Sequence, residues 1–219
     1  MGQAAAFFDM DKTVLAVNSG TLWLQHLVTH REITVYNLAR ALWWLALYQL
    51  ALVDGEFVTA EGVSTVKGQR EADMRRVCDR WFAEKVAPHI TAGACARVAE
   101  HRAEGHLLAV LSSSSPYASE PLGAHLGIPH VLCTRLEVQD GIFTGGVAGS
   151  VCFGRGKVRV AEEFARERDV DFSASWFYTD SYSDLPMLAR VGHPVAVNPD
   201  LRLRRHARAR GWPILSWTR

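Results

Sequence analysis

Short apolar runs bounded by turn residues recur along this chain, and helical patterns separate most of them. The strand-like runs occupy residues 4–8, 107–111, 130–133, 175–178 and 194–197. A helical pattern covers residues 157–168, where Val160, Phe164 and Ala165 share one face. Because parallel strands need long crossover connections, this alternation predicts an α/β fold with a doubly wound, mostly parallel, Rossmann-like sheet.

Two segments interrupt this alternation. Residues 15–87 show helical periodicity and almost no strand signal directly after the first run, which predicts a helical cap inserted into the α/β core. We therefore expect a core of residues 1–14 and 88–219 and a cap of residues 15–87. Residues 136–147 form two short alternating segments around Asp140-Gly141, the pattern of a small β-hairpin.

Composition limits the class of protein. With 219 residues, 48% of them hydrophobic and 21% charged, the chain can bury a core as one α/β domain with a smaller insertion. Its 24 basic and 23 acidic residues give a net charge of +1, so bulk charge indicates no nucleic-acid partner. This balance fits a protein whose partner is a small molecule.

The cysteines and the N-terminus predict a cytoplasmic location. The four cysteines are widely separated and form no C-x-x-C motif, which favours reduced thiols. Residues 1–6 lack a basic segment of the kind that begins a secretory signal.

The most apolar segment, residues 41–53, carries no charge and contains Trp43 and Trp44. A membrane span needs about 20 such residues, so we predict none. A helix buried in the core of the cap is the favoured interpretation. The alternative is an exposed apolar face toward a lipid-like substrate, a membrane surface or a second subunit. A homo-oligomer is therefore possible, but the sequence does not indicate one.

Two pairs of acids follow strand-like runs. Asp9 and Asp11 come after the first run, and because residues i and i+2 of an extended chain point the same way, both carboxylates can face one point. Asp180 and Asp184 follow the run at 175–178. Carboxylates gathered from two strand ends make the oxygen-rich kind of site that Mg²⁺ prefers.

A hydroxyl group and a lysine complete the candidate site. Ser112 and Ser113 follow the run at 107–111, and Lys157 begins a helical pattern after a Gly-Arg-Gly segment. Strand ends of a doubly wound sheet converge on one crevice, so these groups can meet the acids there. Acids, a hydroxyl and a lysine together suggest phosphoryl transfer through a carboxylate nucleophile, with Mg²⁺ as cofactor.

The order of these residues resembles the four motifs of the haloacid dehalogenase (HAD) superfamily, in its phosphoserine-phosphatase-like branch, subfamily IB. The motifs are D-x-D-x-T at residues 9–13, a strand ending in Ser112 or Ser113, Lys157, and D-x-x-x-D at residues 180–184. The resemblance also identifies the helical insertion as a C1-type cap.

The resemblance implies a role for each motif. Asp9 is the nucleophile that forms an aspartyl-phosphate, and Asp11 is the general acid and then the general base. The phosphate-binding residues are Thr13, Ser112 or Ser113, and Lys157. Mg²⁺ is held by Asp9, Asp180 and the backbone carbonyl of Asp11, with Asp184 as a partner of metal-bound water or of Lys157.

The chain departs from the phosphoserine phosphatases in the expected cap. Those enzymes carry a glutamate nine residues after the nucleophile to hold the substrate amine, and here the position is Asn18. We expect Asn18 and Arg70 to influence substrate selectivity.

The resulting prediction is a Mg²⁺-dependent phosphatase of a small phosphorylated metabolite, whose identity the sequence leaves open. The alternatives are phosphoserine hydrolysis proper and a non-enzymatic phosphate- or metabolite-binding regulator. Because a phosphate ester leaving as an alkoxide needs a proton, Asp11 favours a phosphatase over cleavage of a carbon–halogen bond. We assign no role to the nine histidines or to the arginine-rich residues 202–210.

Overall fold

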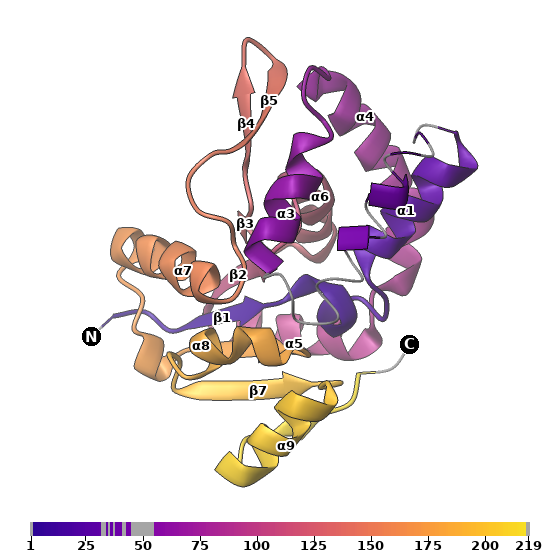
Figure 1. Cartoon of the computed structure of the whole chain (residues 1–219). Helices are drawn as coiled ribbons and strands as arrows, with labels where there is room; N and C mark the ends of the chain where they lie inside the picture. Colours follow the sequence, from indigo (N-terminus) through magenta and orange to yellow (C-terminus); the bar gives the residue numbers. More distant parts are fainter. Residues whose placement is uncertain are drawn as a thin grey trace.

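The structure is a computed structural model that describes residues 2–31, 34, 36, 38–40, 43–44 and 55–217. Its core is a six-stranded parallel sheet in the order β3-β2-β1-β6-β7-β8 (Figure 1). The strands are β1 (Ala5–Phe8), β2 (Leu107–Ser112), β3 (His130–Cys133), β6 (Trp176–Thr179), β7 (His193–Val197) and β8 (Ile214–Leu215). The predicted fold class and the predicted strand-like runs are confirmed, and β8 is an edge strand that the sequence analysis did not predict.

Both faces of the sheet are buried, as the alternation along β1 shows. Ala6 and Phe8 belong to one hydrophobic cluster, and Ala5 and Phe7 belong to another on the opposite face. The first cluster includes residues of α5 (Ala92–Ala103) and α6 (Pro116–Leu126). The second includes residues of α7 (Arg155–Arg168), α8 (Leu185–Leu188) and α9 (Leu201–Arg210). Helices on two faces make the sheet doubly wound.

The strand order locates the place where a ligand can bind. From β1 the chain proceeds through β2 to β3 on one side, and then returns to β6 on the other side of β1. In open α/β sheets, ligands bind outside the carboxyl ends of the strands at such a switch point. The acids that follow β1 and β6 stand at this position.

Helices α1 (Ser19–Thr29), α3 (Gly55–Ser64) and α4 (Glu71–Trp81) lie between β1 and β2 in the chain. The shorter helical turns span Met10–Val14, Phe82–Val86, Ala87–His89, Phe172–Ala174 and Tyr182–Asp184.

The predicted hairpin is present as β4 (Leu136–Gln139) and β5 (Ile142–Val147), and it extends beside α3 rather than joining the large sheet (Figure 1). The backbone N–H of Glu71 donates to the carbonyl of Gly141 at 2.9 Å, and Gly68 donates to Phe143 at 2.9 Å. The hairpin therefore packs with the inserted helices, although the predicted boundaries assign it to the core. The boundaries at residues 14 and 87 stay a prediction.

Most of the apolar segment 41–53 lies outside the described residues. Within it, Trp43 is 61% exposed, and the ring of Trp44 packs edge-on against Phe57 with centroids 5.0 Å apart. In the described part of the chain, no helix has the length and apolar character that crossing a membrane requires.

Candidate active site

A buried ion-pair cluster lies at the carboxyl end of the sheet. The Lys157 ammonium donates to Asp9 Oδ1 at 2.6 Å and to Asp184 Oδ2 at 2.7 Å. The side chains of Lys157 and Asp184 are each 3% exposed, and that of Asp9 is 9% exposed. The structure thus brings together three residues that the sequence analysis predicted from separate motifs.

Gly156 explains how Lys157 reaches this point. The first turn of α7 packs so tightly that a Cβ atom at Gly156 would lie 1.9 Å from the carbonyl oxygen of Val151. Only glycine permits this approach of two backbone segments. The close packing directs Lys157, one residue later, into the interior beneath the carboxyl ends of the strands.

Asp184 is held from a second side by Thr179, the last residue of β6. The buried Thr179 hydroxyl donates to Asp184 Oδ2 at 2.7 Å and accepts the N–H of Ser181 at 3.2 Å. The same carboxylate oxygen receives the Lys157 ammonium, so its position is fixed by two donors. Thr179 is a site residue that the sequence analysis missed, although it directly precedes the D-x-x-x-D motif.

Asp11 lies on the turn that follows β1. Lys12 has a positive φ of 55°, and Leu15 N–H donates to the carbonyl of Met10 at 2.9 Å, so the chain winds tightly here. Asp11 Oδ1 accepts the backbone N–H of Ser19 at 2.8 Å, and Oδ2 accepts from the Asn18 amide at 3.4 Å. Asp11 is thereby bound to the beginning of α1.

Thr13 completes the turn, because its buried hydroxyl donates to Asp9 Oδ2 at 3.4 Å. Ser112 ends β2, the strand that pairs with β1, and is 1% exposed. Ser112 Oγ accepts the N–H of Ser114 at 3.1 Å, and Ser114 Oγ lies 3.3 Å from Ser19 Oγ. Ser113 lies half-buried between them, and the choice between Ser112 and Ser113 as phosphate ligand stays a prediction.

Burial dominates the electrostatics of the acids. Burial raises the pKa of Asp9, Lys157 opposes this shift, and Asp184 and Asp180 add to it. Burial also raises the pKa of Asp180 to about 7, against the opposing effect of Lys12. The pKa of Asp11 is raised by burial, although hydrogen bonds from Ser19 lower it.

For the Lys157 ammonium, the neighbouring carboxylates together have a larger effect on the pKa than burial does. Burial lowers its pKa, but Asp184 and Asp9 outweigh that effect, so the pKa stands above its ordinary value. Lys157 therefore carries a positive charge in this cluster.

The site has more acids than buried cations. Asp9, Asp180 and Asp184 influence one another electrostatically, while Lys157 is the only buried lysine or arginine in the described part of the chain. Excess carboxylate in a low-dielectric site is costly unless a cation joins it. The predicted metal ligands, Asp9, Asp180 and the Asp11 carbonyl, all offer hard oxygen atoms, so their chemistry fits a divalent cation such as Mg²⁺.

The two predicted selectivity residues are placed differently. Asn18 is the N-cap of α1: its Oδ1 accepts the backbone N–H of Thr21 at 3.0 Å while its amide reaches Asp11. Arg70 is exposed at the start of α4, where its backbone bridges to Ile142 of the hairpin. Asn18 thus adjoins the acid cluster, and the selectivity roles of both residues stay predictions.

Comparison with known sequences places the chain in a family. A family model described as haloacid dehalogenase-like hydrolase matches residues 6–189. A probable phosphatase of Mycobacterium tuberculosis (strain H37Rv) is 34% identical, over 99% of this chain and 76% of the relative. A phosphoserine phosphatase of the same strain is 30% identical, over 96% and 70%. A histidinol-phosphatase of Neisseria meningitidis serogroup C is 28% identical, over 97% and 98%.

Solved structures agree with this placement. A protein of unknown function from Bordetella pertussis Tohama I superposes with a TM-score of 0.90 at 25% identity, covering 98% of this chain and 99% of that one. A phosphoserine phosphatase with a phospho-aspartyl intermediate analogue shares the fold, with a TM-score of 0.70 at 19% identity over 100% and 95% of the two chains. The predicted class, a hydrolase of phosphomonoesters, is confirmed. The chain belongs to the haloacid dehalogenase-like hydrolases, as a phosphoserine-phosphatase-like member of that family.

Proposed function

We propose that this protein is a Mg²⁺-dependent phosphatase that hydrolyses a small phosphomonoester through an aspartyl-phosphate on Asp9. The observation that carries the proposal is the buried Lys157, which contacts Asp9 and Asp184 at the switch point of the sheet. A buried ammonium beside a carboxylate can bind phosphoryl oxygens and keep the attacking group in place.

In the first step, a carboxylate oxygen of Asp9 attacks phosphorus and the bond from phosphorus to the ester oxygen breaks. Asp11 donates a proton to the departing alkoxide. In the second step, Asp11 accepts a proton from the water that attacks the aspartyl-phosphate, which releases inorganic phosphate and restores Asp9. The contacts of Asp11 with Ser19 and Asn18 would hold the acid in position for both transfers.

The remaining residues support these two steps. Lys157, Thr13 and Ser112 or Ser113 would bind the phosphoryl oxygens. Asp9, Asp180 and the Asp11 carbonyl would hold Mg²⁺, which when bound neutralises charge on the acids and the phosphate. Asp184 would orient Lys157, supported by the Thr179 hydroxyl.

We also propose that residues 15–87 act as the cap that selects the substrate, with core residues 1–14 and 88–219. The contacts of α3 and α4 with the hairpin support a cap that includes both helices. A cap of this kind excludes water and contacts the leaving group. We further propose that the protein acts in the cytoplasm and that its substrate is a small phosphorylated metabolite.

Phosphoserine is the alternative substrate, because a relative that is 30% identical is described as a phosphoserine phosphatase. Asn18 argues against it, since the amide carries no charge for a substrate amine and its polar atoms are engaged with Thr21 and Asp11. A non-enzymatic phosphate-binding regulator is the remaining alternative. The arrangement of two carboxylates with Lys157 argues against it, because binding alone needs no proton donor.

The test is release of inorganic phosphate from a panel of phosphomonoesters that includes phosphoserine and histidinol phosphate, with Mg²⁺ and with EDTA. The Asp9→Asn variant is measured in parallel. Metal-dependent turnover that the variant loses is expected. A folded wild-type protein that binds phosphate and Mg²⁺ but turns over no ester would favour the regulator.

A further inference from the structure

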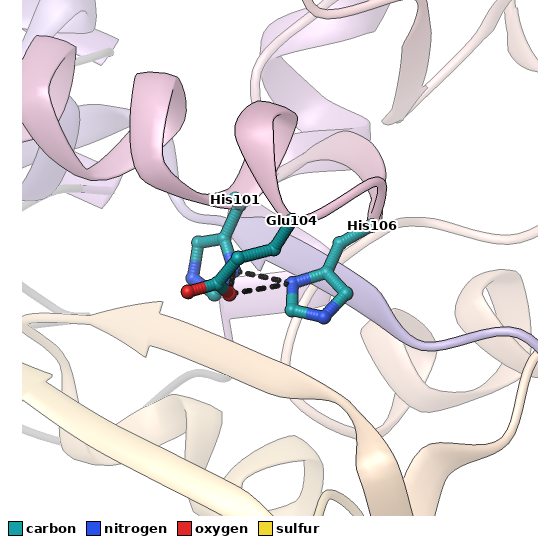
Figure 2. A group of neighbouring side chains, drawn as sticks. All are labelled: His101, Glu104 and His106. Carbon is teal, nitrogen blue, oxygen red and sulfur yellow. Dashed lines mark hydrogen bonds and ion pairs between the residues drawn. The ribbon is translucent and has the colours of Figure 1, made fainter.

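A second cluster of metal-binding groups lies away from the carboxylates, at the end of α5. His101 is in the last turn of the helix, Glu104 is its C-cap, and His106 follows on the turn into β2 (Figure 2). Gly105 has a φ of +75°, which lets the chain reverse so that His106 returns to His101. The side chains of His101, Glu104 and His106 are 4%, 60% and 16% exposed.

The three candidate ligand atoms form a small triangle. His101 Nδ1 and His106 Nδ1 are 2.8 Å apart. Glu104 Oε2 lies 3.3 Å from His106 Nδ1 and 3.9 Å from His101 Nδ1. In a tetrahedral zinc site with Zn–N distances of about 2.0–2.1 Å, neighbouring ligand atoms are about 3.3 Å apart. The triangle thus has nearly the size that such a site requires, with shifts of about half an ångström.

The surroundings of His101 suit a metal ligand. Its Nε2 lies 2.8 Å from the hydroxyl of Tyr178, whose oxygen can accept a hydrogen bond from Nε2–H when Nδ1 holds a metal. Trp176 packs against both imidazoles, with ring centroids 4.9 Å from His101 and 4.7 Å from His106. Both rings are therefore held in position, and the exposed Glu104 leaves a side open through which an ion and a water molecule can enter.

We propose that His101, Glu104 and His106 form a second metal site, for Zn²⁺ or a similar transition-metal ion, with water at the open fourth position. A donor set of two imidazole nitrogens and one carboxylate favours binding of Zn²⁺ over binding of Mg²⁺. Binding would replace the His101–His106 hydrogen bond, because neither Nδ1 atom can carry a proton while it holds the ion. In the described part of the chain, no other set of three His, Cys, Asp or Glu side chains has its ligand atoms within 4.8 Å of one another. The Mg²⁺ ligands proposed above are two carboxylates and a backbone carbonyl.

Tyr178 connects the site to the proposed nucleophile through the sheet. Tyr178, which contacts His101 with its hydroxyl, accepts the backbone N–H of Asp9 with its carbonyl oxygen at 2.9 Å. The ring of Phe8, directly before Asp9, stacks on Tyr178 with centroids 5.0 Å apart. A bound ion would fasten the end of α5 to the turn into β2, and the contact of His101 with Tyr178 would connect this segment to β6. The expected role is therefore stabilisation of this side of the sheet.

The test uses the full chain free of any affinity tag, titrated with Zn²⁺ by calorimetry in the presence of excess Mg²⁺. Co²⁺ serves as a spectroscopic probe, because tetrahedral Co²⁺ absorbs visible light far more strongly than octahedral Co²⁺. The ligand variants are His106→Gln and Glu104→Gln, both at positions where the side chain reaches solvent. The matched controls are His206→Gln on α9 and Glu100→Gln, an exposed acid on α5 that pairs with Arg97.

The proposal expects one Zn²⁺ per chain, an intense Co²⁺ spectrum and a rise in Tm with Zn²⁺. Both ligand variants should weaken binding by more than about 10-fold, while both controls bind as the wild type does. Repeating the titration with Asp9→Asn separates this site from the carboxylate cluster, because that variant should keep the tetrahedral spectrum. Equal affinity in the ligand variants and the wild type, or only weak binding of several ions per chain, would overturn the proposal as adventitious binding.

Discussion

Lys157 donates a 2.6 Å hydrogen bond to Asp9, although the two lie 148 positions apart in the sequence. The side chains of Lys157 and Asp9 are 3% and 9% exposed, so water has little access to the ion pair. A buried lysine stays charged only beside carboxylates. The stability of this part of the fold and the proposed chemistry therefore both depend on Lys157, which also pairs with Asp184.

Replacing Asp9 with asparagine should abolish activity without unfolding the protein. The amide cannot attack phosphorus, so we expect phosphate release to fall by at least about 10⁴-fold. The substitution removes one of several crowded carboxylates, so the Tm without Mg²⁺ should be unchanged or higher. Phosphate release and thermal unfolding of the same preparation test both statements, and residual turnover near the wild-type rate would contradict Asp9 as nucleophile.

Replacing Lys157 with methionine should damage both activity and stability. The variant leaves Asp9 and Asp184 buried without their cation, which costs about 3–5 kcal/mol in the free energy of unfolding. We expect kcat/KM to fall by about 10²–10³-fold. Urea unfolding provides the comparison with Lys85→Met, an exposed position that should change stability by less than about 0.5 kcal/mol. Equal stability of the two variants would contradict the structural role of Lys157.

The Thr179→Val variant tests whether the hydroxyl positions Asp184. Valine keeps the shape of the side chain but loses the 2.7 Å hydrogen bond to the carboxylate. We expect a loss of about 1.5–3 kcal/mol in stability and a decrease in kcat of about 10-fold. The control is Thr29→Val on the exposed end of α1, which should leave kcat unchanged. A Thr179→Val enzyme with wild-type kcat would show that Asp184 needs no support from this hydroxyl.

Two substitutions at Asn18 separate its two contacts. Serine can still cap α1 but loses the amide contact to Asp11, so Asn18→Ser should lower kcat several-fold while keeping the Tm. Asn18→Ala loses both contacts, and its stability should fall by about 1 kcal/mol more than that of the serine variant. Steady-state kinetics and thermal unfolding measure the two effects, and identical kinetics in both variants and the wild type would exclude a role in positioning Asp11.

Because His101 is buried, we expect the protein to lose stability in mildly acidic solution. Burial lowers its pKa from 6.5 to about 4, with smaller contributions from His106, Arg97 and His193. Between these pH values the unfolded chain binds the proton more readily, so the stability that the neutral imidazole provides is lost as the pH falls from 6.5 toward 4. The full effect amounts to about 3 kcal/mol.

The measurement is urea unfolding with EDTA at pH 7.5 and pH 5, comparing wild type with His101→Gln. The variant is needed as a reference because Asp180 has the opposite effect on stability. Its pKa is raised to about 7 in the folded protein, so its protonation stabilises the fold as the pH falls. The wild type should lose more stability than the variant between the two pH values. An equal loss in both proteins would contradict a neutral, buried His101.

Patterns over a few residues predicted much of the fold. The apolar runs correspond to five of the six strands because fully buried parallel strands leave a local signal of continuous apolar residues. The two-residue β8 has no such signal, since Ile214 and Leu215 form an edge strand through their pairing with β7. The hairpin was predicted from Asp140-Gly141, but its packing against the inserted helices depends on contacts between distant segments.

By itself, the sequence determined the type of sheet, the family and the order of the motif residues, because strand periodicity and short motifs are local properties. Only the tertiary structure decided which groups meet. The contacts of Thr179 with Asp184, of Ser19 with Asp11, and of His101 with His106 and Tyr178 depend on side-chain direction and on how helices pack against the sheet. Spacing along the chain does not contain that information, since a buried polar group takes its partners from whatever segments the hydrophobic core brings beside it.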